Sequence, residues 1–164
     1  MYIDFNSLPD SARVWIYQSN RELTSAEVLE IKSMGKNFVN EWTAHQYTLH
    51  SSFEVLHNYF LVIAVDENVN IASGCSIDKS VHFIKEVEKK YKLKLFDRLA
   101  VGFYWKSKVQ VVSLNSFLNF FKENQNSTIE IFNNFIETKK ELAENWKVLV
   151  KDSWVANRVQ DKGN

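Results

Sequence analysis

Residues 59–65, YFLVIAV, form the longest apolar run of the chain and constrain its fold more than any other stretch. A short apolar run rich in β-branched and aromatic residues is typical of a strand that is buried on both faces. Asp66-Glu67-Asn68 follows, and these residue types favour a turn. Residues 52–57 precede the run with alternating side chains, and His57-Asn58 can form the turn between the two segments. The sequence therefore predicts a β-hairpin whose second strand is central in a sheet.

Helix-forming patterns lie on both sides of this hairpin. Thr24 and Glu27 have the spacing of a capping box, in which each side chain satisfies a free backbone N–H at a helix start. Apolar residues at helical spacing follow, so we expect a helix over residues 25–42. A second helix is expected over residues 77–91, with Ser76 as its N-cap.

Two further segments complete the order of elements. Residues 13–18 and residues 99–104 are rich in β-branched and aromatic side chains, which predicts a strand in each. Together with the hairpin and the two helices they give the order β-α-β-β-α-β. This order matches a split βαβ arrangement. We therefore predict an α+β protein with a ferredoxin-like βαββαβ core.

The C-terminal part is expected to add an aromatic-rich β/α extension to this core. Its predicted elements are a strand over residues 108–112, a short helix over 114–122 and a helix from the capping box at Thr138 to Trp146. Residues 128–137 fit no single pattern. Large aromatic side chains anchor cores and interfaces alike. The pattern thus leaves open whether this cluster is core or interface: Phe117, Phe120, Phe121, Phe132, Phe135, Trp146 and Trp154.

Composition and charge exclude several classes of protein. The 164 residues carry 20 Lys and Arg against 20 Asp and Glu, and 45% are hydrophobic, so the chain is unlike a disordered segment. Its single Cys excludes a disulfide framework. The longest apolar run is far shorter than the roughly 20 residues of a membrane span. Zero net charge argues against a nucleic-acid partner, because that binding relies on a basic face.

The ends of the chain and the distribution of Pro, Gly and Ser indicate how the protein is organised. The N-terminus has neither the basic nor the long apolar region of a signal peptide, so we expect a cytoplasmic protein. No Pro-, Gly- or Ser-rich linker divides the sequence. Residues 1–160 are therefore expected to form a single domain, followed by a frayed polar tail at residues 161–164.

Several strings of the sequence resemble a family of small bacterial proteins to which no reaction is assigned. The resemblance covers nearly the whole chain and rests on RVWIYQSNR (13–21), WTAH (42–45), IAVDE (63–67), ASGCSID (72–78), Asn145-Trp146 and Ser153-Trp154. Members often carry the label "ABC transporter ATPase". This chain departs from the family pattern near its end, where no Pro precedes Ser153 and Val155 replaces a His.

The glycine content contradicts that ATPase label. A Walker A loop follows the pattern G-x-x-x-x-G-K-[ST], because its backbone N–H groups must approach the phosphates closely. Gly35 precedes Lys36, but Asn37 stands in place of Ser or Thr and Glu30 in place of the first Gly. We therefore expect neither ATP chemistry of this type nor a cofactor.

The segment from residue 73 to residue 78 is the main candidate for a binding site. It lies between a predicted buried strand and a helix start, where backbone N–H groups attract anions. We expect a non-catalytic binding or adaptor domain that takes a small anionic ligand or a protein partner. The candidate ligand-binding residues are Ser73, Gly74, Cys75, Ser76 and Asp78, with Arg13, Arg21 and His45 nearby. The competing interpretation is that the segment only caps the helix.

Two other functions remain open. In the first, Cys75 is the nucleophile of a small thiol-dependent enzyme, with His45 as its base and Asp66 as the orienting group. In the second, Trp15 and Tyr17 share one face of the first strand and stack on RNA bases. The histidines and Cys75 lack zinc-ligand spacing, so no metal is expected.

Overall fold

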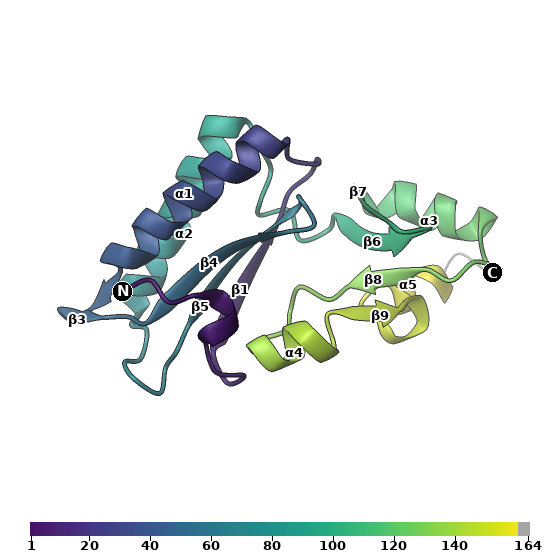
Figure 1. The fold of residues 1–164 in the computed structure, drawn as a ribbon. Coiled ribbons are helices and arrows are strands. Elements are labelled where there is room, and N and C mark those ends of the chain that lie inside the picture. Colours follow the sequence, from purple (N-terminus) through teal and green to yellow (C-terminus); the bar gives the residue numbers. More distant parts are fainter. Residues whose placement is uncertain (161–164) are drawn as a thin grey trace.

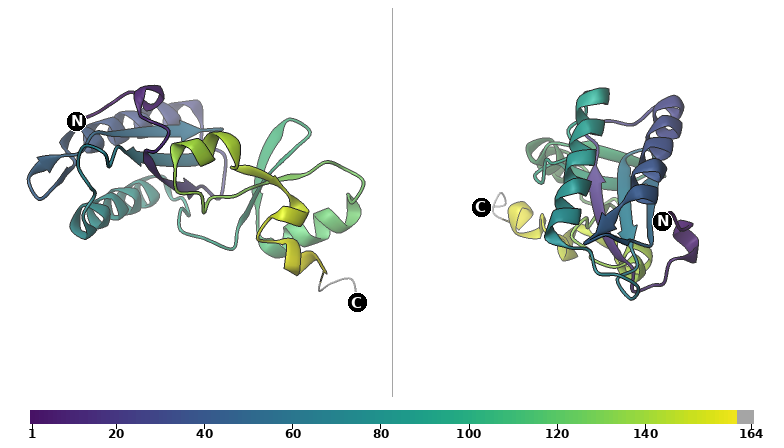
Figure 2. Two further views of the ribbon diagram at one scale, coloured as in Figure 1. Left: turned by 90° about the horizontal axis from the view of Figure 1, so that it is seen from below. Right: turned by 90° about the vertical axis from the view of Figure 1, so that its left-hand side faces the viewer.

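The computed structural model describes residues 1–160 and contains two main antiparallel sheets that lie one after the other along an elongated molecule (Figure 1). The predicted tail at 161–164 lies outside the described residues. N-terminal elements build the first sheet and C-terminal elements build the second. Views from two further directions show the same arrangement (Figure 2).

The first sheet has the strand order β1-β5-β4, and a small β2-β3 hairpin lies beside it. The elements of this part are η1 (Phe5–Ser7), β1 (Arg13–Gln18), α1 (Ser25–Glu41), β2 (Thr43–Ala44), β3 (Tyr47–Thr48), β4 (Ser51–Leu56), β5 (Phe60–Val65) and α2 (Gly74–Tyr91). The second sheet has the order β7-β6-β8-β9. Its elements are β6 (Val101–Trp105), β7 (Lys108–Val112), α3 (Leu114–Glu123), β8 (Glu130–Phe132), α4 (Lys139–Glu144), β9 (Lys147–Leu149), η2 (Val150–Asp152) and α5 (Ala156–Gln160).

The apolar run predicted as a central strand is central and buried. All residues of β5 are buried, and β5 pairs antiparallel with β1 on one side and β4 on the other. Ile63 lies opposite Trp15 of β1 and opposite Phe53 of β4. The predicted hairpin is therefore confirmed, and burial on both faces explains why its second strand is apolar throughout.

The two faces of the first sheet have different covers. The helices α1 and α2 lie on one face, where Ile31 and Val87 join Leu61 in one apolar cluster. The other face is covered by the N-terminal segment, α4 and the chain after β8, so that Leu8 and Trp146 pack near Phe60 (Figure 1). Burial on both sides fixes the register of the sheet, because a shift by one residue would exchange its faces.

Both long helices begin with side-chain caps. The capping box of α1 is formed as predicted between Thr24 and Glu27. The helix α2 begins earlier than expected, because the side chain of Ser73 accepts from the backbone N–H of Ser76. Ser73 is thus the N-cap, and Ser76 lies buried within the first turn.

The α+β class is confirmed, but the ferredoxin-like βαββαβ core is not. In such a core the last strand of the motif joins the same sheet as the first. Here β6 lies between β7 and β8 in the second sheet. At the edge of β1 away from β5, residues 1–160 make only an isolated antiparallel bridge, which joins Arg13 to Thr138. Strand β1 is therefore an edge strand of the first sheet.

The C-terminal extension supplies its own core. Phe103, Phe117 and Ile131 are fully buried between the second sheet and the segments that carry α3 and α5. Most of the predicted aromatic cluster is buried or half-buried, whereas Phe135 is 59% exposed. Within residues 1–160, no helix has both the length and the apolar character needed to cross a membrane.

Candidate functional site

The outer edge of β1 carries backbone groups that lack partners among the described residues. The N–H of Val14 donates outward to the carbonyl oxygen of Glu137 at 2.9 Å, whereas the N–H of Ser19 donates to Tyr59 within the first sheet at 2.8 Å. Successive residues of a strand direct these groups to opposite sides. Ile16 and Gln18 therefore direct their N–H and C=O groups outward. Within residues 1–160, no strand pairs with this edge at those two positions.

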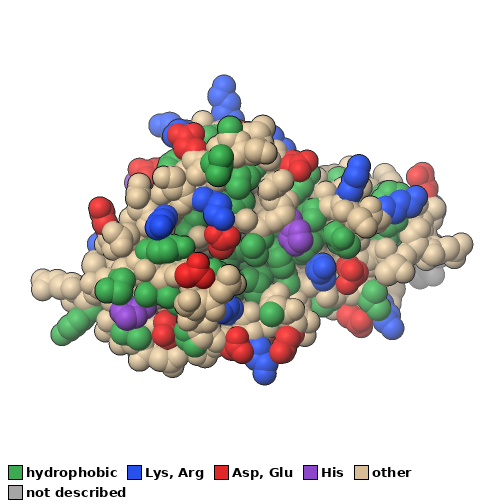
Figure 3. Space-filling view, in the orientation of Figure 1, with side chains coloured by type: hydrophobic (Ala, Val, Ile, Leu, Met, Phe, Trp, Pro, Cys, Tyr) green, Lys and Arg blue, Asp and Glu red, His purple; other side chains and the backbone are tan. Residues whose placement is uncertain are grey.

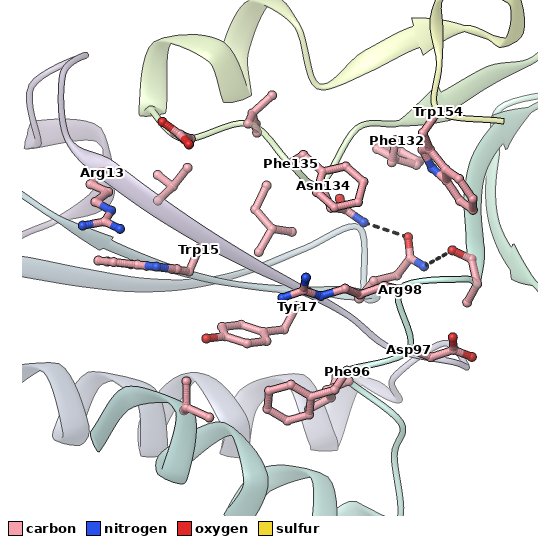
Figure 4. A pocket seen from close by; sticks show the side chains of 18 of the residues that line it. Arg13, Trp15, Tyr17, Phe96, Asp97, Arg98, Phe132, Asn134, Phe135 and Trp154 are labelled. Carbon is pink, nitrogen blue, oxygen red and sulfur yellow. Dashed lines mark hydrogen bonds between the residues drawn. The ribbon is translucent and has the colours of Figure 1, made fainter. Parts of the chain in front are cut away.

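A cleft of about 480 Å³ runs along the free edge, and we name it the β1-edge cleft (Figure 4). It is lined by β1, by residues 95–100 and α2 on one side, and by residues 132–137 with Trp154 on the other. Its volume lies in the usual range of ligand sites. The strand edge is thus open between two walls that come from distant parts of the chain.

Two exposed aromatic rings lie on opposite sides of the strand. Phe96 is 39% exposed and packs edge-on against Tyr17, with ring centroids 5.5 Å apart. Phe135 is on the other side of β1 (Figure 4). Burial raises the pKa of the Tyr17 hydroxyl, so this ring stays neutral at physiological pH. Exposed rings around one cleft are typical of a surface that meets a partner.

Two guanidinium groups differ in how they are held at the cleft. Cζ of Arg13 lies over the Trp15 ring, 4.6 Å from its centroid, and Nη1 of Arg13 is 3.6 Å from Glu67 Oε1. Arg98 reaches along the cleft toward the middle of β1 (Figure 4). No carboxylate among the described residues lies within ion-pair distance of Arg98. The cleft therefore presents one guanidinium that is available to an anion.

A hydrogen-bond network closes one end of the β1-edge cleft. Gln18 Nε2 donates to the carbonyl oxygen of Ala100 at 3.3 Å, and Asn134 Nδ2 donates to Gln18 Oε1 at 3.0 Å. Trp146 Nε1 in turn donates to Asn134 Oδ1 at 2.9 Å. A Cβ at Gly102 would lie 2.1 Å from Gln18 Oε1, so the glycine leaves the space this network occupies.

The predicted segment 73–78 forms the start of α2. The Ser73 side chain caps the helix, and Ser76 Oγ donates to the Ser73 carbonyl oxygen at 2.8 Å. Gly74, Cys75 and Asp78 are exposed. Cys75 and Asp78 line a second cleft of about 520 Å³ beside α1, which they share with His82.

The remaining predicted residues lie apart from this segment. His45 is exposed in the turn between β2 and β3, and Asp66 caps the turn after β5 by accepting from the Asn68 N–H. Arg21 binds both carboxylate oxygens of Glu27, at 2.9 and 2.8 Å. None of these three residues lines either cleft, whereas Arg13 lines the β1-edge cleft. The structure thus brings Cys75 together with neither His45 nor Asp66 in these clefts.

The first-strand aromatics face the helices. Trp15 packs edge-on against Trp42, with centroids 6.1 Å apart, and Tyr17 packs against Phe96. Both rings are half-buried, so only part of each is available in the cleft. Among the described residues, no three His, Cys, Asp or Glu side chains are grouped as a metal site would require.

Two cleft residues, Phe96 and Arg98, were not among the predicted site residues, and Phe135 was predicted only as part of the aromatic cluster. Phe96 and Arg98 lie in the connection between α2 and β6, which has no periodic pattern. Phe135 follows Asn133-Asn134, which interrupts a strand-like alternation. The feature that indicates a binding site is the free edge of β1. It follows from the pairing of β6 in the second sheet, which the sequence pattern does not predict.

Other parts of the surface are mixed in character. On the face shown in Figure 3, acidic and basic side chains are interspersed, and hydrophobic side chains gather where the two halves of the molecule meet. No protein-family model, curated protein or solved structure matches this chain. The family resemblance therefore stays a prediction.

Proposed function

We propose that the protein is a non-catalytic binding domain of the cytoplasm that takes an extended segment of a partner protein along β1. The observation that carries this proposal is the unpaired edge at Ile16 and Gln18, open in a cleft between two walls. A free strand edge is a template for another strand, and folded proteins use it to bind extended peptides.

The walls of the β1-edge cleft suit the side chains of such a segment. A strand beside β1 would direct alternate side chains to opposite sides of the first sheet. On one side they would meet Ile77, Val81 and Phe96, and on the other Phe135 and Ile136. The main-chain hydrogen bonds would supply affinity, and the two apolar walls would select the residue types.

The position of the edge favours a peptide over a second folded copy. Phe96 and Phe135 lie on either side of β1, so the edge is recessed between them (Figure 4). The sheet of another folded domain would have to displace both walls to reach it. A single extended chain, with strands in a sheet about 4.8 Å apart, has a much smaller cross-section.

The experiment starts from a displayed library of random peptides with free C-termini, selected on the purified protein. Affinities of the enriched peptides are then measured by fluorescence anisotropy for the wild type and for the Phe135→Ser and Leu29→Ser variants. Both residues are exposed, but Leu29 lies on α1 and does not line the cleft. Leu29→Ser is therefore the matched control for the loss of an exposed apolar side chain.

The proposal predicts that Phe135→Ser weakens binding about tenfold, which corresponds to about 1.4 kcal/mol, while Leu29→Ser leaves it unchanged. Thermal unfolding of both variants should match the wild type, because neither side chain is buried. Failure to enrich any peptide, or equal binding by Phe135→Ser and wild type, would contradict the proposal.

A further inference from the structure

We infer that the bound segment is the C-terminal end of its protein, and that its terminal carboxylate pairs with the guanidinium of Arg98. The inference rests on the proposed function and specifies its ligand. It follows from two features of the β1-edge cleft, namely the short length of the free edge and the availability of Arg98.

The free edge is blocked at both ends. At one end Val14 donates to the Glu137 carbonyl oxygen, and Arg13 bridges to Thr138. At the other end the Gln18 side chain holds Ala100 against the strand. The open part between these blocks is centred on Ile16 and covers about three residues, or roughly 10 Å of strand.

A short blocked edge favours a chain end over a continuous chain. A continuous chain would have to bend away from β1 on both sides within a few residues, and each bend would leave the strand conformation. A chain that ends in the cleft needs to bend only once. Its last residues can pair with Ile16 and direct their side chains toward Phe96 and Phe135 without displacing Thr138 or Ala100.

Arg98 supplies the charge that a chain end would meet. Its guanidinium reaches along the cleft toward the middle of β1 (Figure 4). Two other charged side chains of the cleft have partners within the protein. Asp97 Oδ1 accepts from the Leu99 N–H at 3.0 Å, and Arg13 lies beside Glu67. Glu137 also lines the cleft. It is next to the Thr138 bridge, so its charge disfavours a carboxylate at that end and favours one beside the Arg98 guanidinium.

A carboxylate matches this guanidinium in shape as well as charge. Arginine presents parallel N–H donors that bind both oxygens of a carboxylate, and such charge-assisted bonds are roughly twice as strong as neutral ones. An internal peptide segment would offer Arg98 only a neutral carbonyl or a side chain of variable length. A terminal carboxylate lies at a fixed distance from the last backbone groups and can therefore set the register of the added strand.

The test compares free-acid and C-terminally amidated forms of one enriched peptide. Isothermal titration gives their affinities for the wild type and for the Arg98→Gln, Arg98→Lys and Lys94→Gln variants. Lys94 is the matched control, because it is exposed in the same connection but does not line the cleft. Arg98 is also exposed, so its replacement should leave the unfolding temperature unchanged.

We expect the free acid to bind the wild type and Lys94→Gln at least about tenfold more tightly than the amide. In Arg98→Gln the acid should bind no better than the amide, and Arg98→Lys should restore part of the difference. Equal binding of acid and amide by the wild type would overturn the inference and leave the proposed function intact. A preference for the acid that persists in Arg98→Gln would also overturn it. Failure of both forms to bind would instead refute the proposed function.

Discussion

Gln18 and Asn134 join the two main sheets across the end of the β1-edge cleft. Asn134 Nδ2 donates to Gln18 Oε1 at 3.0 Å, although the two residues are 116 positions apart in the sequence. Gln18 belongs to the first sheet, and Asn134 follows β8 of the second. Their contact fixes one wall of the cleft relative to its strand, so the geometry of the proposed site depends on it.

Replacing Gln18 by Leu tests this contact. The substitution removes the hydrogen bonds to Ala100 and Asn134 and leaves both half-buried partners short of a bond. A typical hydrogen bond contributes about 0.5–1.5 kcal/mol, so we expect the free energy of unfolding to fall by about 1–2 kcal/mol. Urea unfolding measures it, with Gln125→Leu as the exposed control. Equal stability of the two variants would show that the contact does not hold the sheets together.

Two glycines in helices offer a matched test of packing. A Cβ at Gly35 of α1 would lie 2.0 Å from Cδ1 of the buried Phe53 ring, whereas a Cβ at Gly74 of α2 would have no neighbour within 4 Å. We expect Gly35→Ala to force α1 away from β4 and to destabilise the protein by about 1–3 kcal/mol. Gly74→Ala should be neutral or stabilising by up to about 1 kcal/mol. Equal unfolding temperatures for the two variants would contradict the close packing of α1 on β4.

The Arg21–Glu27 ion pair predicts a specific dependence on pH. The Arg21 guanidinium and the Thr24 N–H lower the pKa of the Glu27 carboxyl from 4.5 to about 2. A carboxyl whose folded-state pKa is lowered stabilises the fold above its unfolded pKa, and this contribution is lost as the pH falls. The loss should therefore occur between about pH 4.5 and pH 2.

Glu27→Gln isolates this contribution. At pH 7 the variant should be less stable than the wild type by about 1 kcal/mol, the upper range for a partly exposed ion pair. The difference should shrink at pH 3, because the Glu27 carboxyl of the unfolded chain binds a proton below about pH 4.5 whereas that of the folded protein does so only near pH 2. Urea unfolding at both values, with exposed Glu123→Gln as control, measures the effect. A difference that does not change with pH would refute the role of the ion pair.

Alkylation of Cys75 separates the two candidate binding surfaces. The thiol is exposed at the start of α2 and lines the second cleft, not the β1-edge cleft. A bulky maleimide on Cys75 should therefore leave the affinity for an enriched peptide unchanged. Anisotropy before and after labelling measures this, with Cys75→Ser as the unlabelled control. Loss of binding on labelling would move the site to residues 73–78, as the sequence pattern alone predicts.

Local patterns predicted most of the elements because their causes are local. The capping boxes at Thr24 and Thr138 and the apolar run at 59–65 each depend on neighbours within a few residues. The place of β6 in the sheets is only partly local. A two-residue turn at Lys106-Ser107 joins β6 to β7, but the pairing of β6 with β8 and not with β1 is set by long-range packing.

The same limit explains why the cleft was not predicted. In the sequence Gly102 is an ordinary glycine within a predicted strand. In the structure it leaves the space in which the Gln18 side chain makes its hydrogen bonds to Ala100 and Asn134. Phe135 belongs to the aromatic excess of the C-terminal part, and nothing near it in the sequence separates it from the buried Phe132. The cleft forms because β6 pairs in the second sheet and leaves β1 at the edge of the first. It can therefore be recognised only once the strand pairing is known.

Amide hydrogen exchange of β1, resolved by NMR, shows whether a bound peptide pairs with the free edge of this strand. Trp15 and Tyr17 direct their N–H groups to β5, whereas Ile16 directs its N–H to the free edge. In the free protein Ile16 should exchange much faster than its two neighbours. Addition of an enriched peptide should slow exchange at Ile16 by at least about tenfold and leave Trp15 and Tyr17 unchanged. Unchanged exchange at Ile16 with the peptide bound would show that the peptide does not pair with β1 and would refute strand addition as the mode of binding.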